Sequence, residues 1–148
     1  MTAPTIHASA VLAGARAVLI RGAAGSGKSS LAFALIQAGG NTLLFTRLVG
    51  DDRVHVEAAH GRLLVRPAAT LKGLIEVRGL GIRRVPFEPL AAVGLVIDLG
   101  APDAERLPAP PGTTTEVAGI ALPRLAVAAC ADALPLLFAA LRTTESGG

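Results

Sequence analysis

The sequence predicts an α/β domain with a central β-sheet, one helix directly after a glycine-rich loop and a second helix near the C-terminus. Three observations support this prediction. Short apolar segments with alternating or continuous hydrophobicity are typical of strands and occur along the whole chain. The glycines at 22–27 follow a strand-like segment, and apolar residues recur at helical spacing immediately after them. The chain has 148 residues, which is the usual length of one domain with its own core.

The first elements are a hairpin, the loop and a helix. Residues 6–12 and 17–20 are strand-like and flank Gly14, which predicts a β-hairpin whose second strand is buried. Helical spacing covers residues 29–37, and the pair Gly39-Gly40 is a typical C-terminal stop.

Strands dominate the rest of the prediction. They are expected at 43–49, 54–56, 62–65 (joined to the preceding strand by a turn at His60-Gly61), 91–99 and 113–117. Thr70 predicts the cap of a short helix over 71–76, and Asp132 predicts the cap of the last helix. The polar, proline-rich residues 102–112 are expected to form a surface loop, and residues 143–148 a frayed tail.

Composition excludes several classes of protein. The chain is 51% hydrophobic, which excludes a disordered chain. Its most apolar stretch, 121–141, contains Arg124, Asp132 and two prolines, so no uncharged run is long enough for a membrane span. The N-terminus has no signal-peptide pattern, and we expect a soluble, cytoplasmic protein.

Charge and cysteine content narrow the possible partners further. The net charge is +3, but the basic residues are scattered, and the chain has four Phe with no Tyr or Trp on which bases could stack. We therefore expect no nucleic-acid partner. The single cysteine, Cys130, excludes an intrachain disulfide framework and is expected to be a small buried residue among alanines.

The glycine-rich loop carries the first chemical signal. Its residues fit the pattern G-x-x-x-x-G-K-[ST] at every fixed position: Gly22, Ala23, Ala24, Gly25, Ser26, Gly27, Lys28 and Ser29. Glycines let successive N–H groups form a concave anion site, and the following helix adds the positive end of its dipole. Lys28 would reach the β- and γ-phosphates, and the Ser29 hydroxyl would ligate Mg²⁺. The motif therefore predicts binding of a nucleoside triphosphate.

Other polar residues allow more than one interpretation. Asp51 and Asp52 follow an apolar strand and could supply a metal ligand and a base for phosphoryl transfer, or could form a solvated turn. His7 on the first strand is either a surface residue or part of the site. Glu76 precedes a glycine turn and could be only a helix-end charge. His55 and His60 fall in a predicted hairpin, and their spacing is not that of metal ligands.

Taken in order, these residues resemble the catalytic domain of HPr kinase/phosphorylase, in its short alphaproteobacterial form. The resemblance rests on His7, the loop 22–29, Asp51-Asp52-Arg53-Val54, and Glu76-Val77-Arg78-Gly79-Leu80-Gly81-Ile82. It implies a P-loop kinase domain over residues 1–148, without the N-terminal domain of longer members, that uses ATP and Mg²⁺. It also implies that Lys28 binds the phosphates. By the same resemblance, Ser29, Glu76 and Asp52 would hold the metal. Asp51 would be the base, assisted by His7.

The resemblance further implies the partner and the reaction. The expected substrate is a serine of HPr, the phosphocarrier protein of the bacterial phosphotransferase system, and the chain is a possible homo-oligomer. The family's C-terminal arginine segment has no counterpart in residues 127–136, so we predict the kinase activity and not the phosphorylase activity. Two alternatives remain, a non-catalytic ATP-binding module that docks HPr and a small-molecule P-loop kinase.

Overall fold

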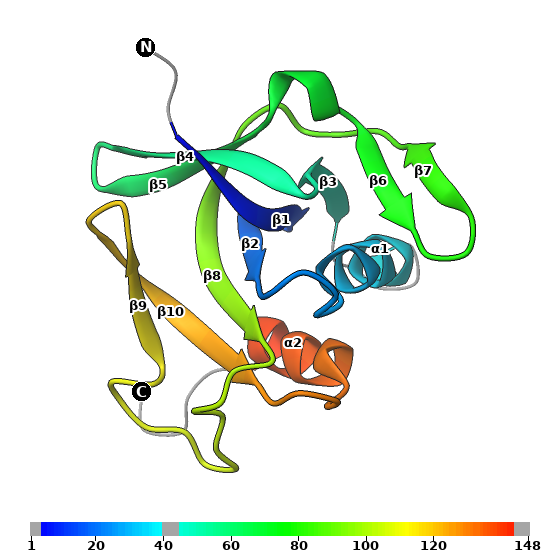
Figure 1. The fold of residues 1–148 in the computed structure, drawn as a ribbon. Coiled ribbons are helices and arrows are strands. Elements are labelled where there is room, and N and C mark those ends of the chain that lie inside the picture. The colour runs from blue at the N-terminus through cyan, green and yellow to red at the C-terminus, as the bar shows by residue number, and fades with distance from the viewer. Residues whose placement is uncertain (1–3, 40–44, 144–148) are drawn as a thin grey trace.

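The computed structural model describes residues 4–39 and 45–143. It confirms a mixed α/β fold with a sheet and two α-helices (Figure 1). The elements are β1 (Thr5–Ala13), β2 (Arg16–Arg21), α1 (Lys28–Gly39), β3 (Thr46–Gly50), β4 (Arg53–Ala59), β5 (Arg62–Pro67), a 3₁₀ turn (Ala69–Leu71), β6 (Leu74–Val77), β7 (Gly81–Arg84), β8 (Ala91–Leu99), β9 (Thr114–Val117), β10 (Ile120–Val127) and α2 (Ala133–Arg142).

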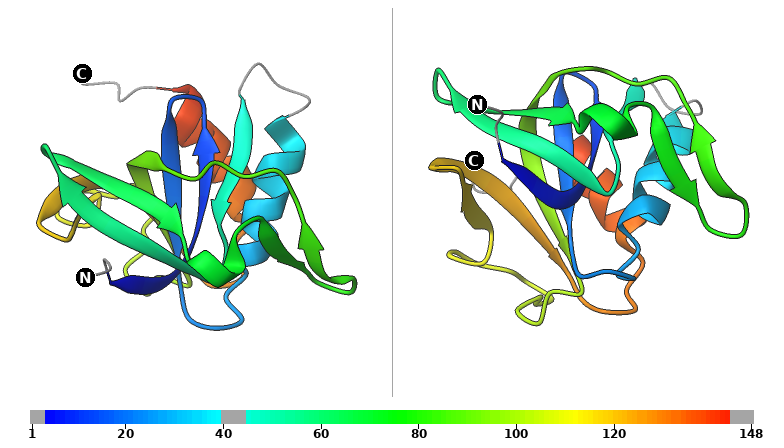
Figure 2. Two further views of the ribbon diagram at one scale, coloured as in Figure 1. Left: turned by 90° about the horizontal axis from the view of Figure 1, so that it is seen from above. Right: turned by 45° about the horizontal axis from the view of Figure 1, so that its top comes forward.

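The main sheet has eight strands and curls back on itself. β1 pairs with β4 through residues 5–7 and with β2 through residues 8–13. β2 pairs with β8, which also pairs with β5, and β5 returns to β4 (Figure 2). β2, β8 and β10 run parallel, so their carboxyl ends reach the same edge of the sheet.

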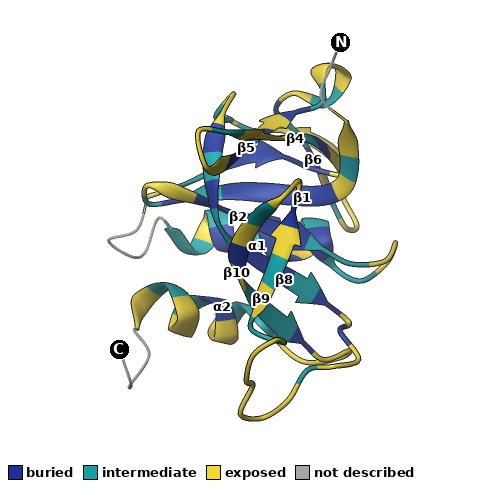
Figure 3. Cartoon of the chain, turned by 90° about the vertical axis from the view of Figure 1, so that its left-hand side faces the viewer, coloured by how far each residue is buried: buried dark blue, intermediate teal, exposed yellow. Residues whose placement is uncertain are grey.

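Two apolar clusters lie on opposite faces of this sheet. One is enclosed by the curled strands and contains Leu19 and Leu63. The other lies under both helices, where Leu35 of α1 and Leu137 of α2 are completely buried. β1 separates the clusters and is buried along most of its length, whereas much of α2 is exposed (Figure 3). Neither of the α-helices in the described residues has the length and apolar character needed to span a bilayer.

An ion-pair network joins the three parallel strands below the glycine-rich loop. Arg21, the last residue of β2, donates to both carboxylate oxygens of Asp98 on β8 at 2.7 and 2.9 Å. Arg124 on β10 donates to Asp98 and, at 2.7 and 3.0 Å, to Asp103. Burial alone would raise the pKa of Asp98, but its hydrogen bonds from the two guanidinium groups outweigh burial and lower that pKa. The network fixes the strand end from which the loop starts.

Several local predictions are confirmed. The β4–β5 hairpin turns at His60 and Gly61, both with positive φ, as its predicted tight turn requires. The Asp132 side chain accepts from the Leu134 N–H at 3.2 Å and caps α2. Three predicted features lie outside the described residues: the helix stop at Gly40, the first two residues of the strand expected from residue 43, and tail residues 144–148.

Other predictions are wrong. Residues 71–76 do not form a helix, because residues 74–77 pair with β7 and bury Ile75 under α1. The strand β10 was not expected, although it forms parallel pairs with β8. Cys130 is exposed rather than buried, because β10 ends at Val127 and Cys130 lies in the turn before α2.

Candidate active site

The glycine-rich loop connects the end of β2 to the first residue of α1. Gly25 and Gly27 have φ of 81° and 101°, a conformation that glycine adopts without strain. A Cβ on Gly22 would collide with the Ser26 side chain. The Lys28 side chain is buried, and its Nζ donates to the carbonyls of Gly22 at 2.9 Å and Ala23 at 3.1 Å. The ammonium group therefore lies on the loop, as a phosphate-binding lysine requires.

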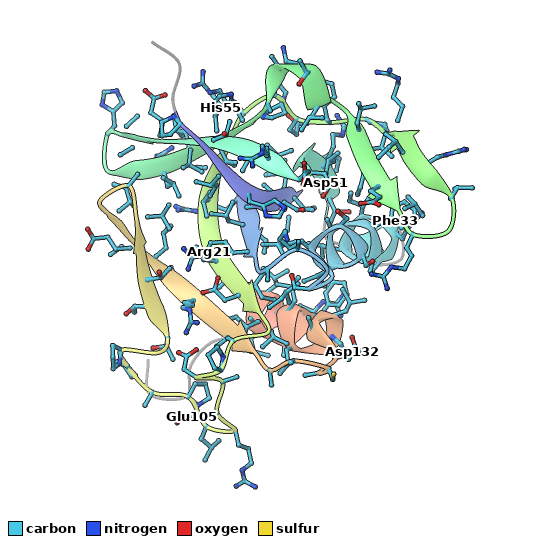
Figure 4. The ribbon with its side chains drawn as sticks, viewed as in Figure 1. Arg21, Phe33, Asp51, His55, Glu105 and Asp132 are labelled. Carbon is cyan, nitrogen blue, oxygen red and sulfur yellow. The ribbon has the colours of Figure 1, made fainter. Side chains whose placement is uncertain are left out.

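Asp51 is the buried centre of the site. It directly follows β3 and lies between α1 and β6 (Figure 4). Ser9 of β1 donates to its Oδ1 at 2.6 Å, and the Ser29 hydroxyl lies 2.8 Å from each carboxylate oxygen. The backbone N–H of Glu76 donates to Oδ2 at 3.1 Å. Three elements therefore hold this carboxylate beside the first turn of α1.

Asp52 has a different environment. Its φ is 68°, so the backbone turns sharply at Asp52, and the side chains of Asp51 and Asp52 point in different directions. Its side chain is 64% exposed, and Oδ1 lies 3.1 Å from Nε2 of His7. His7 and Ser9 are two residues apart on β1 and therefore face the same side of that strand. β1 thus contacts Asp52 through His7 and Asp51 through Ser9.

A cavity of about 360 Å³, here called the acidic cavity, opens beside the loop. Its lining includes His7, Ala24, Gly25, Gly27, Lys28, Ser29, Asp52, Glu76 and Arg78. Glu76 enters from β6, where it is paired across the strands with Ile82 of β7. Ile82 is 64% exposed and Leu80, in the turn of this hairpin, is 60% exposed. The β6–β7 hairpin therefore forms one wall of the cavity, with Ile82 exposed on the same face of the hairpin as Glu76.

The structure brings most of the predicted site residues together. His7, Lys28, Ser29, Asp52 and Glu76 line the acidic cavity, and Asp51 lies directly beneath Ser29. Two loop residues, Ala23 and Ser26, instead line a second cavity on the other side of the loop.

Sequence reasoning missed Ser9. Its signal was a polar residue in the middle of an otherwise apolar strand, at a position that the structure shows to be completely buried. A buried hydroxyl needs a hydrogen-bond partner, and this one is Asp51.

Known proteins share sequence and fold with this chain. The family model for the HPr Serine kinase C-terminal domain matches residues 2–87. The HPr kinase/phosphorylase of Clostridium tetani is 39% identical over 82 residues, covering 55% of this chain and 24% of that protein. That of Limosilactobacillus reuteri is 35% identical over 122 residues, covering 74% of this chain and 36% of that protein. The chain thus spans about a quarter to a third of these curated relatives.

A solved structure extends the similarity beyond the matched segment. The HPr(Ser) kinase/phosphatase from Coxiella burnetii superposes with a TM-score of 0.72 and 30% identity, covering 93% of each chain. The family model, these relatives and this shared fold lead to one conclusion: the chain belongs to the HPr serine kinase C-terminal domain family.

Proposed function

We propose that this chain is an ATP-dependent kinase domain that phosphorylates a serine of HPr. The observation that carries the proposal is the separation of two adjacent carboxylates at the start of α1. Asp51 is buried against Ser29, and Asp52 is exposed beside His7. Phosphoryl transfer to a hydroxyl needs a carboxylate for the metal and a second group for the proton. The names of the relatives support HPr as the acceptor.

The loop and Lys28 would bind the phosphates of ATP. Backbone N–H groups of a glycine-rich loop and the N-terminus of α1 favour negative charge. The Lys28 ammonium is already held at the loop by two carbonyl oxygens. Exchange of these contacts for phosphate oxygens would place its charge on the β- and γ-phosphates.

The residues at the start of α1 fit a magnesium ion. Asp51 and Ser29 offer a carboxylate and a hydroxyl, which are the hard oxygen donors that Mg²⁺ prefers. Within residues 4–39 and 45–143, no group of three or more His, Cys, Asp or Glu could hold a metal alone. Mg²⁺ commonly completes its coordination with substrate phosphates and water. When bound, the ion would neutralise charge on the phosphate oxygens.

The geometry favours an exchange of the roles that the sequence suggested for the two aspartates. A base must reach the acceptor hydroxyl, and Asp52 is exposed in the cavity wall, whereas Asp51 is buried beneath it and accepts from Ser9, Ser29 and the Glu76 N–H. We therefore assign proton removal to Asp52, with His7 orienting its carboxylate, and metal binding to Asp51. Glu76 lines the same cavity and remains a candidate second metal ligand.

A protein acceptor fits the cavity better than a small molecule. The wall formed by the β6–β7 hairpin exposes Leu80 and Ile82, and Arg78 of the same hairpin lines the cavity. Exposed apolar side chains flanked by arginine are typical of protein-contact surfaces.

A transfer assay tests the proposal. The purified chain, MgATP and HPr would be incubated, and the mass of intact HPr measured, with Lys28→Ala and Asp52→Asn as controls. We expect one added phosphate on HPr, lost in both controls. Unmodified HPr together with measurable ATP binding would contradict the kinase and favour the non-catalytic ATP-binding module.

A further inference from the structure

A second cavity of about 340 Å³ lies on the other side of the glycine-rich loop, outside the proposed catalytic site. Its lining comes from loop residues 23–26, from Leu99 and Gly100 after β8, and from residues 127–131 after β10. Alanine is the commonest residue of the lining, so we call it the alanine-lined cavity. Its volume lies within the range of pockets that bind small molecules.

This cavity lies where parallel sheets bind ligands. β2, β8 and β10 are parallel, and their arrowheads point toward the loop and toward the turn before α2 (Figure 1). The segments that line the cavity are those that leave the carboxyl ends of these three strands. In α/β proteins, ligands commonly bind outside the carboxyl ends of parallel strands.

The loop is the common wall of the two cavities. Ala24 and Gly25 line both. A ligand whose phosphates lie on this loop must extend the rest of its structure to one side. The acidic cavity presents the charged groups of Lys28, Asp52, Glu76 and Arg78 and is needed for the acceptor, whereas among the described residues no Asp, Glu, Lys, Arg or His lines the alanine-lined cavity.

The chemistry of the lining suits a nucleoside. Small apolar side chains leave a smooth surface for a flat heteroaromatic ring. We propose that the alanine-lined cavity binds the base and ribose of the nucleoside triphosphate whose phosphates lie on the loop. This inference rests on the proposed nucleotide binding.

Cys130 provides a specific test, because it is the only cysteine of the chain, is exposed and lines this cavity. The rate at which a thiol reagent modifies Cys130 would be measured with ATP, with inorganic tripolyphosphate and without ligand. Calorimetry would establish the binding of each. At ten times its dissociation constant, ATP should slow modification about tenfold, because only the free fraction reacts. Tripolyphosphate bound to the same degree should leave the rate nearly unchanged.

A variant adds a second readout. Ala129→Leu would partly fill the cavity from an exposed position and should weaken ATP binding about tenfold, the size of effect that single methylene groups have in apolar pockets. Its affinity for tripolyphosphate should not change. Ala58→Leu, on the exposed β4–β5 hairpin, is the matched control and should change neither affinity.

The outcomes separate this inference from the proposed function. Binding of ATP without protection of Cys130, or equal weakening of ATP and tripolyphosphate by Ala129→Leu, would overturn the inference and leave the kinase proposal intact. If neither ATP nor tripolyphosphate binds, the proposed function fails and the inference fails with it.

Discussion

The hydroxyl of Ser9 donates a 2.6 Å hydrogen bond to the carboxylate of Asp51, although 42 residues separate them in the chain. Ser9 and Asp51 are both buried, so this bond is formed away from solvent. Together with Ser29 and the Glu76 N–H, it sets the direction of the carboxylate at the start of α1. The geometry of the site therefore depends on a strand that carries no recognisable phosphate-binding motif.

Ser9→Ala removes one of the three groups that hold Asp51. We expect a loss of about 1–2 kcal/mol in the free energy of unfolding, because a buried hydrogen bond to a charged group is broken. We also expect a higher Mg²⁺ requirement for phosphoryl transfer. Denaturant unfolding and a Mg²⁺ titration of activity would measure both. The control is Thr70→Ala, which removes an exposed hydroxyl outside the cavity lining and should change neither value. If Ser9→Ala left the free energy of unfolding unchanged, the hydrogen bond from Ser9 to Asp51 would not stabilise the fold as we expect.

Lys28→Ala should abolish tight binding of ATP. The ammonium is the one positive side chain within the loop motif, and alanine also leaves the Gly22 and Ala23 carbonyls without their donor. Calorimetry with MgATP would measure the effect. Lys72→Ala, which removes the other lysine of the chain, is the control and should bind ATP normally. Equal affinities of the two variants would refute the role of the loop.

Ile82→Ser tests the β6–β7 hairpin as the acceptor surface. The side chain is 64% exposed, so the substitution should cost little stability. We expect a higher KM for HPr with an unchanged KM for ATP, because the apolar contact with the protein acceptor is lost. Steady-state kinetics with each substrate varied in turn would show this. An unchanged KM for HPr would place the docking surface elsewhere.

Asp98→Asn tests the ion-pair network beneath the loop. Its carboxylate accepts from Arg21 and Arg124, and its loss should reduce the free energy of unfolding by about 2 kcal/mol at neutral pH. Because the folded-state pKa of Asp98 is lowered, the ionised carboxylate stabilises the fold above the ordinary pKa, and this contribution is lost as pH falls through the folded-state value. The difference between wild type and variant should therefore shrink below about pH 4. A difference that grows toward acid pH would contradict this.

Local sequence signals predicted which residues lie together at the loop better than they predicted some of the strands around it. The loop residues, Lys28 and Ser29 belong to one continuous motif. The sequence His60-Gly61 strongly favours a tight turn. The segment 71–76 was misassigned because Thr70 resembles a helix cap. Its strand forms only through pairing with residues 81–84, and local propensity does not reveal such pairing.

The division between the two aspartates also depends on tertiary structure. Alternation along a strand suggests that neighbours face opposite sides, but the sequence does not show which of them is buried. The answer comes from β1, which places Ser9 on Asp51 and His7 beside Asp52. Cys130 was misplaced for a similar reason, because its alanine-rich surroundings resemble a core segment but form a surface turn.

The most direct test of this account compares Asp51→Asn and Asp52→Asn in single-turnover transfer from ATP to HPr over a range of Mg²⁺ concentrations. Asp52→Asn should bind MgATP normally and slow transfer by roughly 10²–10⁴-fold at every Mg²⁺ concentration, the contribution typical of a general base. Asp51→Asn should instead shift the Mg²⁺ dependence to higher concentrations. The reverse pattern, with Mg²⁺ dependence shifted only in Asp52→Asn, would contradict the assignment of the buried carboxylate to the metal and the exposed one to the proton.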